Sequence, residues 1–349
     1  MDLRNTSKQI GVIGAGSFGS AVANILAEKN DHVLLHARTA EKANSMQTTR
    51  TYSGHTLHPN VEVIHDIARI GEQCDVIFPV IPSASFREMM RTLSPYLRPY
   101  HILIHGTKGF DLNRRTSTED EPVSREDVHT MSEVIQQESS VVRVGCLAGP
   151  NLATEISEGK PAATVVASQF DEVVQIGQKL LKNDRFLIYG SSDLLGIELC
   201  GILKNIIALG AGTVVGLGLG ENAKALFISR GLVEMVHIGK AMGGNAQAFL
   251  GLAGVGDLMA TCSSNLSRNF TVGRKLAEGK TIEVILEEME EVAEGVKTID
   301  IIRDLANSFG IRCPITETLY RVIHQQITVT DAHTYLMKFP FRAEIDFLD

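Results

Sequence analysis

The first apolar stretch of the chain, residues 8–13, runs directly into a glycine-rich turn, Gly14-Ala15-Gly16-Ser17-Phe18-Gly19. Apolar residues at helical spacing follow the turn, so we expect a strand, a tight turn and a helix. The pattern GxGxxG in this context is typical of dinucleotide-binding folds. Gly14 permits the tight turn, Gly16 lets the backbone approach a pyrophosphate, and Gly19 lets the helix pack on the strand. The free N–H groups at the helix start would then bind the phosphates.

The alternation of strand and helix continues through the first half of the chain. Further strands are expected at residues 32–37, 61–64, 75–81, 101–105, 141–146, 162–167 and 186–189. Repeated βα units predict a parallel, doubly wound sheet whose ligands bind at the carboxyl ends of the strands. The period then becomes helical, with helices expected at residues 221–242, 269–277, 281–289, 296–309, 315–327 and 331–337. We therefore predict an α/β chain: a Rossmann-like dinucleotide-binding domain over residues 1–192 and a mostly α-helical substrate domain over residues 193–349.

The end of the second expected strand indicates which dinucleotide is bound. NAD-selective sites usually place an acidic residue there, which holds the ribose hydroxyls. This strand ends in His36-Ala37-Arg38, while Asp31 lies at its other end and Glu41 lies in the following helix. The planar guanidinium of Arg38 suits a 2′-phosphate. We therefore expect NADP(H) to be favoured, with NAD(H) as an alternative cofactor; an ordinary surface arginine is the competing interpretation.

Residues 193–220 are the most apolar part of the chain. Apolar side chains occupy every side of this stretch at helical length, so we expect a helix buried inside the protein. Its one cation is Lys204, which Asn205 follows. Burial lowers the pKa of a lysine toward the range where it exchanges protons, although a snorkelling or salt-bridged lysine is the simpler interpretation. The glycines in its second half, followed by Glu221, argue against a membrane span.

Two segments place polar residues after expected strands. Lys108, in Gly106-Thr107-Lys108-Gly109, is positioned to contact an anionic substrate, or is an ordinary loop lysine. Asn151 follows Gly149-Pro150 as a helix cap, a substrate hydrogen bonder, or both. The polar residues 112–127 are interpreted as an exposed loop insertion.

Two segments of the helical half also place polar or charged residues at a turn or at the start of a helix. Asp257 follows a glycine-rich turn, where its carboxylate could pair with a lysine. Ser267-Arg268-Asn269 opens a helix with a hydroxyl, a guanidinium and an amide, a group that suits a phosphate dianion. Simple capping by Asp257 and by Ser267 is the alternative.

Composition argues against several classes of protein. A chain of 349 residues favours two domains, and its formal net charge of −8 argues against nonspecific nucleic-acid binding. The N-terminus lacks the layout of a signal peptide. The five cysteines are scattered, with no CxxC pair and no histidine at ligand spacing. We therefore expect no metal site, and buried thiols in a reducing cytoplasm.

Taken together, these segments resemble bacterial NAD(P)H-dependent glycerol-3-phosphate dehydrogenases. The resemblance runs from the opening GVIGAGSFGSAVA to the helix after Pro314. It includes seven motifs in order: GAGSFG, HGTKGF at Lys108, AGPNLATEI at Gly149, IELCGILKNIIALGAG around Lys204, AGVGDLMATC around Asp257, SRN at residues 267–269, and VAEGVKT at Glu294. It implies the reversible reduction of dihydroxyacetone phosphate to sn-glycerol 3-phosphate, which feeds phospholipid synthesis.

The resemblance also implies roles for residues at the matching positions. Lys204 would donate and accept the proton at the carbonyl oxygen, and Lys108, Asn205 and Asp257 would line the substrate site and orient the proton transfer. The substrate phosphate would be held by Arg268 and Asn269, with further substrate contacts from Ser267, Gly149 and Asn151. The dinucleotide would be contacted, besides Gly14, Gly16 and Gly19, by Ser17, Phe18, Arg38, Lys108, Ala153, Arg268, Val292 and Glu294.

The chain departs from the family pattern in three places. Asn151 stands where bacterial relatives usually carry serine or threonine, Phe18 stands where tryptophan is common, and the insertion after Leu112 is long. None of these differences removes a chemical group that the reaction needs.

Two other functions fit parts of the sequence. A dehydrogenase of the same architecture that acts on a β-hydroxy acid would also carry a lysine on the long helix, but Ser267-Arg268-Asn269 favours a phosphate over a carboxylate. A nonenzymatic NADPH sensor would need the glycine turn without Lys204, Lys108 and Asp257. A homodimer is the default expectation for the assembly.

Overall fold

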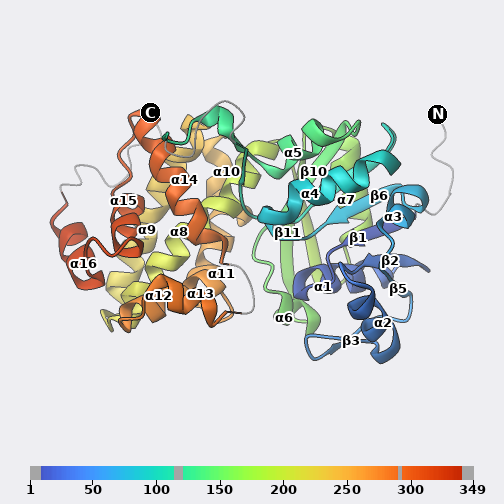
Figure 1. Cartoon of the computed structure of the whole chain (residues 1–349), viewed down its shortest axis with the longest axis horizontal. Coiled ribbons are helices and arrows are strands. Elements are labelled where there is room, and N and C mark those ends of the chain that lie inside the picture. The colour runs from blue at the N-terminus through green and yellow to red at the C-terminus, as the bar shows by residue number, and fades with distance from the viewer. Residues whose placement is uncertain (1–8, 114–120, 290–292, 340–349) are drawn as a thin grey trace. The chain divides into compact units, whose positions relative to one another are not determined.

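The computed structural model of the chain describes residues 9–113, 121–289 and 293–339. The chain forms two compact units: Met1–Thr107 with Met131–Leu194, and Lys108–Thr130 with Leu195–Asp349. In Figure 1 the large sheet lies in the first unit, and the helices coloured from yellow to red belong to the second. The expected boundary after residue 192 lies two residues from one of these divisions. The prediction did not include the packing of residues 108–113 and 121–130 with the helical unit.

The first unit is built on an eight-stranded sheet with the strand order β12-β11-β10-β7-β6-β1-β2-β5. The strands are β1 Ile10–Ile13, β2 Val33–His36, β5 Val61–Ile64, β6 Val76–Pro79, β7 Ile102–His105, β10 Arg143–Ala148, β11 Ala162–Ser168 and β12 Phe186–Ser191. From β5 to β10 every neighbouring pair is parallel. A small antiparallel hairpin, β3 Thr51–Tyr52 and β4 His55–Thr56, lies apart from this sheet. The predicted Rossmann-like sheet is confirmed.

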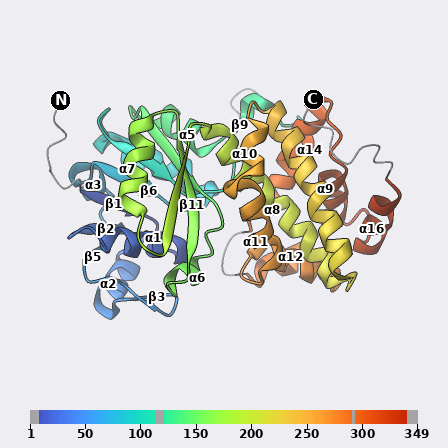
Figure 2. The same ribbon diagram turned by 180° about the vertical axis from the view of Figure 1, so that it is seen from behind.

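Helices cover both faces of the sheet. They are α1 Ser17–Ala27, α2 Ala40–Thr49, α3 Ile67–Gln73, α4 Phe86–Leu93, α5 Met131–Glu138, α6 Ala153–Ser157 and α7 Asp171–Leu181. Successive strand residues point to opposite faces, so Val12 packs with α1 and α7 in one apolar cluster, while Ile13 packs with α3, α4 and α5 in the other. Figures 1 and 2 show these two helical layers from opposite sides.

One pairing differs from the prediction of a wholly parallel sheet. β10 and β11 are antiparallel, with Cys146 opposite Ala167, and β12 runs parallel to β11. The connection before β11 contains only the five-residue helix α6, which packs beside α1. Because such a short helix does not cross the face of the sheet as a parallel connection requires, the chain returns beside β10 in the reverse direction.

The second unit is arranged around one long buried helix, α8 Leu194–Gly216. The others are α9 Gly220–Ala241, α10 Ala246–Leu250, α11 Asp257–Ser263, α12 Arg268–Ala277, α13 Ile282–Glu287, α14 Glu294–Phe309, α15 Pro314–Ile323 and α16 Val329–Lys338. Among the described residues, α8 alone is long and apolar enough to cross a membrane, and 94% of its most apolar window is buried inside the protein. α8 is therefore a core helix of this unit in the structure.

Residues 108–130 add a small hairpin to the helical unit. Its strands are β8 Asp111–Leu112 and β9 Val128–His129. Val123 is buried, and its N–H donates to the carboxylate of Asp304 on α14 over 3.0 Å. Asp127 is buried too, and its carboxylate accepts hydrogen bonds from the N–H and hydroxyl of Ser124. The interpretation of residues 112–127 as an exposed loop was therefore wrong for Val123 and Asp127.

A buried carboxylate connects α9 to the start of α15. Glu234 accepts hydrogen bonds from the N–H groups of Ile315 and Thr316, each over 2.8 Å, and from the Thr316 hydroxyl over 2.5 Å. N–H groups in the first turn of a helix have no partner within it, and α15 has no side-chain cap from its own N-cap residue. Burial raises the pKa of Glu234 to about 7, against the three hydrogen bonds, which lower it.

We expect Glu234→Ala to destabilise the helical unit by about 2 to 4 kcal/mol, because three buried donors lose their acceptor. Denaturant unfolding followed by circular dichroism measures the change. Glu221→Ala is the matched control: it lies on the same helix with its side chain 83% exposed, and we expect an effect within about 0.5 kcal/mol. Equal stability of the wild type and Glu234→Ala would contradict the proposed cap.

Candidate active site

Three residues that the sequence grouped around proton transfer meet inside the helical unit. The carboxylate of Asp257 on α11 lies between two ammonium groups: Oδ1 is 2.9 Å from Nζ of Lys204 on α8, and Oδ2 is 2.6 Å from Nζ of Lys108. Lys204 and Asp257 are buried, whereas the side chain of Lys108 is 19% exposed. One carboxylate therefore compensates a buried cation and also holds a more accessible one.

Thr261 completes this cluster, and the sequence analysis missed it. It lies one turn after Asp257 on α11, and its Oγ1 accepts a hydrogen bond from Nζ of Lys204 over 2.5 Å and donates to Asp257 over 3.1 Å. The available signal was the i,i+4 spacing from Asp257. Within the described part of the chain, Asp257 and Thr261 use two of the three donors of Lys204, which leaves one for a ligand.

Burial and neighbouring charges set the protonation of the cluster. The pKa of Lys204 is lowered to about 8, chiefly by burial and also by the charge of Lys108, while Asp257 opposes both. Burial also disfavours the charged form of Asp257, but the two lysines outweigh this and hold its pKa below the usual value. At neutral pH Lys204 is therefore protonated but close to its titration range, as suits a group that gives and takes a proton.

A π-helical turn, Leu252–Gly256, places Asp257 at the first position of α11. Such turns are rare and occur frequently at functional sites. A Cβ on Gly254 would lie 2.0 Å from the carbonyl oxygen of Phe249 at the end of α10, so the turn folds back on the backbone at a distance that only glycine permits. The carboxylate binds lysines and is not a helix cap, because the N-cap of α11 is Gly256.

Glycines bring α8 and α12 unusually close together. A Cβ on Gly212 would lie 2.1 Å from the carbonyl oxygen of Phe270, and a Cβ on Gly273 would lie 1.8 Å from that of Leu209. Because any side chain would separate the two backbones at these points, the glycines fix where the helices touch. The contact lies about one turn beyond Asn205 on α8 and Asn269 on α12.

Asn205 and Asn269 meet at Gly295, the second residue of α14. A Cβ on Gly295 would lie 2.7 Å from Oδ1 of Asn269 and 2.9 Å from the carbonyl oxygen of Asn205. The Gly295 N–H donates to Asn269 over 2.9 Å, and the Asn205 amide donates to the carbonyl of Lys108 over 3.3 Å. The structure thus joins α8, α12, α14 and the Lys108 segment through two amides.

The start of α12 combines a capping residue with an exposed cation. Ser267 is the N-cap and accepts from the N–H of Phe270 over 3.3 Å, so the capping interpretation of Ser267 is correct. Arg268 is the first residue of the helix and is exposed. A guanidinium at a helix N-terminus gives this position two features that attract an anion.

The glycine turn of the first unit has the geometry that a diphosphate requires. Gly14 has φ +118°, and a Cβ there would lie 2.1 Å from the carbonyl oxygen of Val80; a Cβ on Gly19 would lie 1.9 Å from that of Gly14. A Cβ on Gly16 would meet nothing within 4 Å, so the space beside Gly16 is open. α1 starts at Ser17 with no side-chain cap and no acidic residue in its first turn, which leaves N–H groups for an anion.

Other predicted cofactor residues surround this turn or lie farther along the chain. Phe18 is partly buried against the apolar core, and Arg38 is exposed two residues past β2. Ala153 and Glu294 are the first residues of α6 and α14. Val292 lies outside the described residues.

Asn151 is a hydrogen bonder and not a cap, because the N-cap of α6 is Leu152. Its amide nitrogen donates to Oγ1 of Thr164 over 3.0 Å, whereas its Oδ1 is buried without a hydrogen-bond partner in the described part of the chain. Gly149, at φ +146°, packs against Thr164 as well. A buried acceptor without a donor suits a ligand that brings a hydroxyl or an N–H.

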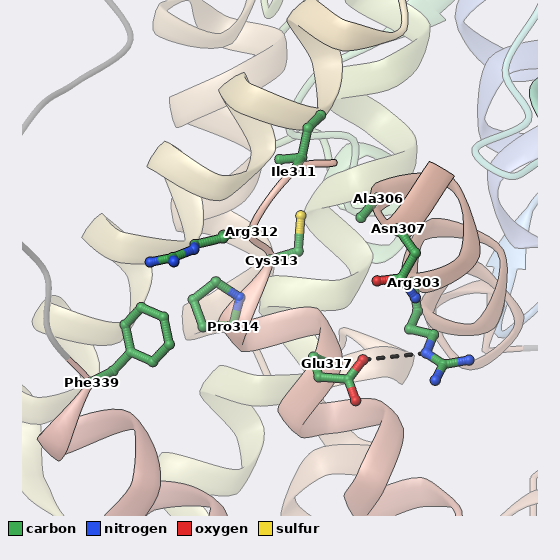
Figure 3. A pocket seen from close by; sticks show the side chains of 9 residues that line it. All are labelled: Arg303, Ala306, Asn307, Ile311, Arg312, Cys313, Pro314, Glu317 and Phe339. Carbon is green, nitrogen blue, oxygen red and sulfur yellow. Dashed lines mark hydrogen bonds and ion pairs between the residues drawn. The ribbon is translucent and has the colours of Figure 1, made fainter. Parts of the chain in front are cut away.

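The helical unit also has a surface cavity of about 560 Å³ between residues of α14 and α15, shown in Figure 3. The predicted site residues do not line it. Arg303 and Glu317 at its wall bind each other over 3.3 Å (Figure 3).

The described residues contain no group of three metal-ligating side chains. All five cysteines are free and buried, and burial raises the pKa of Cys74 and Cys262 to about 12. These two thiols are therefore neutral and poor nucleophiles at physiological pH.

Comparison with known proteins identifies the family of the chain. Residues 9–174 match the model of the NAD-dependent glycerol-3-phosphate dehydrogenase N-terminus, and residues 193–334 match that of its C-terminus. The chain belongs to this family. It is 36% identical to the glycerol-3-phosphate dehydrogenase [NAD(P)+] of Teredinibacter turnerae over 344 residues, 97% of each chain, and 36% identical to that of Pseudomonas fluorescens, over 98% of this chain and 97% of the relative. A crystal structure of glycerol-3-phosphate dehydrogenase from Coxiella burnetii superposes with a TM-score of 0.86 at 30% identity, over 95% of this chain and 99% of the other.

As a member of the glycerol-3-phosphate dehydrogenase family, the chain is an oxidoreductase that uses a nicotinamide dinucleotide. The resemblance expected from the seven sequence motifs is thereby confirmed. The glycine turn, with open space at Gly16 and uncapped N–H groups on α1, fits the diphosphate of such a cofactor.

We expect Gly254→Ala to misplace the Asp257 carboxylate, because the added methyl group collides with the backbone of Phe249. The dehydrogenase should lose stability, by about 1 to 3 kcal/mol, and at least tenfold in kcat. Gly251→Ala is the control, since a Cβ there lies 3.6 Å from its nearest neighbour in a backbone conformation open to alanine. Thermal denaturation and steady-state kinetics measure both effects, and equal behaviour of the two variants would contradict this role of the π turn.

Proposed function

We propose that this chain catalyses the reversible reduction of dihydroxyacetone phosphate to sn-glycerol 3-phosphate, with Lys204 as its proton donor and acceptor. The observation that carries the assignment of Lys204 is its burial beside Asp257, with a pKa lowered to about 8. The product would supply glycerophospholipid synthesis in the cytoplasm.

The reduction requires a proton at the carbonyl oxygen as negative charge grows there. When bound, the reduced nicotinamide supplies the hydride for the carbonyl carbon. Among the described residues, Lys204 has one donor left after its bonds to Asp257 and Thr261, so it can stabilise the developing alkoxide and then protonate it. General acid catalysis of this kind contributes roughly 10²- to 10⁴-fold to the rate.

Asp257, Lys108 and Asn205 position this proton donor. Asp257 fixes the ammonium of Lys204 through Oδ1 and holds Lys108 through Oδ2. The charge of Lys108 lowers the pKa of Lys204 and attracts the anionic substrate. The side-chain amide of Asn205 donates to the carbonyl of Lys108 and so holds this segment; in the proposal, the side-chain oxygen of Asn205 would accept a substrate hydroxyl.

Arg268 and Asn269 would hold the substrate phosphate. Arg268 is exposed at the first position of α12, and Ser267 organises this helix start as its cap. Binding a remote dianion orients the reacting ketone and so converts binding energy into rate. Gly149 and Asn151 would add contacts, since Oδ1 of Asn151 is a buried acceptor without a donor in the described structure.

NADP(H) is the favoured cofactor in this proposal, with NAD(H) as the alternative. The support is Arg38, which is exposed past the end of β2 where an NAD-selective site usually has an acid. Ser17, Phe18, Ala153, Val292 and Glu294 complete the proposed cofactor contacts. A homodimer stays a prediction.

The central test measures reduction by NADPH and by NADH with dihydroxyacetone phosphate and with dihydroxyacetone. We expect turnover with the phosphorylated ketone and a fall of about 10²- to 10⁴-fold in kcat in Lys204→Met, with NADPH binding retained. Because reduction needs the protonated lysine, its kcat should fall as the pH rises through about 8, and kcat of the oxidation should rise over the same range.

Two variants sharpen this test of Lys204. Lys108→Met removes a like charge and should shift the pH profile upward, whereas Asp257→Asn should shift it downward. Lys179→Met, an exposed lysine on α7, is the matched control and should leave kcat unchanged. Near-normal turnover in Lys204→Met would refute its role.

Arg268→Ala should raise KM for dihydroxyacetone phosphate about 10- to 100-fold, since a hydrogen bond to a charged group is worth about 1.5 to 3 kcal/mol. It should also reduce the preference for the phosphorylated ketone. Arg274→Ala, near the other end of the same helix, removes the same charge and should leave KM unchanged. An unaltered KM in Arg268→Ala would exclude the phosphate assignment.

The two competing functions predict other outcomes. A β-hydroxy acid dehydrogenase would reduce a keto acid and not dihydroxyacetone phosphate. A sensor would bind NADPH without turnover. Membership of the glycerol-3-phosphate dehydrogenase family disfavours both.

A further inference from the structure

Two histidines connect the ends of β2 and β5 in the first unit. The ring of His36, the last residue of β2, stacks on that of His65 with 6.3 Å between centroids and 15° between planes. Nδ1 of His65 lies 3.2 Å from the carbonyl oxygen of Ala37, the residue that follows His36, and the main chain of His65 raises the pKa of the His36 ring. The side chain of His65 therefore contacts the end of β2 both through the stacked rings and through the carbonyl of Ala37.

This histidine pair lies at the edge of the sheet where a dinucleotide binds. The N–H of Gly14 donates to the carbonyl of His36 over 3.1 Å, so His36 is tied to the glycine turn. Arg38 follows two residues later and is exposed. In a doubly wound sheet the end of this strand meets the ribose 2′ position, and here a part-buried imidazole stands near the place of the usual acid.

We propose that His36, oriented by His65, is a specificity-determining residue for the adenosine 2′-phosphate, and that it makes the preference for NADP(H) over NAD(H) depend on pH. The proposal rests on the proposed use of NADP(H). A protonated imidazole offers a phosphate a charge-assisted hydrogen bond and adds a second cation near Arg38. A ribose hydroxyl gains far less from that charge, so only the phosphorylated cofactor responds strongly.

The surroundings of His36 determine when it titrates. β1 and α1, which contact β2, carry no titratable side chain. The titratable groups on β5, on α3 and in the turn between them are His65, Asp66, Glu72 and the Glu62–Arg69 ion pair. Burial lowers the pKa of His36; the hydrogen bond to His65 and the charge of Asp66 raise it, and the charge of the His65 ring lowers it. His36 is therefore neutral above pH 7, and a phosphate beside it would favour uptake of a proton on binding.

The experiment measures cofactor binding rather than turnover. Fluorescence titration gives Kd of NADPH and of NADH between pH 6 and pH 8.5 for the wild type, His36→Gln and His65→Gln. His32→Gln is the matched control, because this exposed histidine directly precedes the other end of β2. Calorimetry at pH 7 in buffers of different ionisation enthalpy measures proton uptake.

In the wild type the ratio of the NADH Kd to the NADPH Kd should rise about tenfold from pH 8.5 to pH 6. In His36→Gln the ratio should change much less with pH than in the wild type. In His65→Gln its change should also be smaller than in the wild type. In His32→Gln it should change as it does in the wild type. Proton uptake on NADPH binding should fall in His36→Gln. The ionisation of the 2′-phosphate near pH 6 is common to all variants, so the comparison isolates the histidine.

The same pH dependence and proton uptake in the wild type and His36→Gln would overturn the proposal. An unchanged Kd for NADH shows that the variant is folded, and His36→Phe, which keeps a ring without a charge, gives a second test with the same expectation. Absence of any NADPH preference at every pH, in the wild type and in Arg38→Gln alike, would refute the cofactor preference as well. A preference lost in Arg38→Gln but unaffected by His36→Gln would refute the histidine role alone.

Discussion

The ion cluster around Asp257 is the interaction on which the helical unit depends. An ammonium group inside an apolar helix is costly unless a carboxylate compensates it, and Asp257 compensates Lys204 while it also binds Lys108. Burial is the main reason that the pKa of Lys204 is lowered, and the charges of Asp257 and Lys108 adjust it in opposite directions, so the cluster is both a structural contact and an influence on that pKa. Packing around α8 and the proposed proton chemistry are therefore linked through the same three side chains.

Neighbouring residues on a helix point about 100° apart, so Lys204 and Asn205 need partners from different elements. Lys204 finds them on α11, and Asn205 finds its partner in the segment at Lys108. Glycine provides the necessary approach twice, at the crossing of α8 with α12 and in the π turn before Asp257. The arrangement therefore requires glycine at these points as well as the charged side chains that the close approach brings together.

Much of this arrangement could be predicted from the sequence because the information is local. Strand, glycine turn and helix follow each other at Gly14–Gly19, and an isolated cation in an apolar helix identifies Lys204. The reversal of β11 could not be predicted, since its apolar pattern is the same in either direction. Thr261 was missed because a threonine on a helix usually has no special role. The burial of Val123 and Asp127 was not predicted because their sequence neighbours are polar, and burial there results from tertiary contacts that the local sequence does not indicate.

The burial of all five cysteines has a consequence for work on this enzyme in solution. A buried, neutral thiol reacts slowly with alkylating reagents. A single cysteine introduced on the surface would therefore be the thiol that reacts first, without removal of any native one. Exposed lysines such as Lys179 in the first unit and Lys280 in the second are suitable places for a pair of spectroscopic labels. The distance between such labels, measured with and without cofactor and substrate, would report directly whether ligand binding changes the separation of the two units.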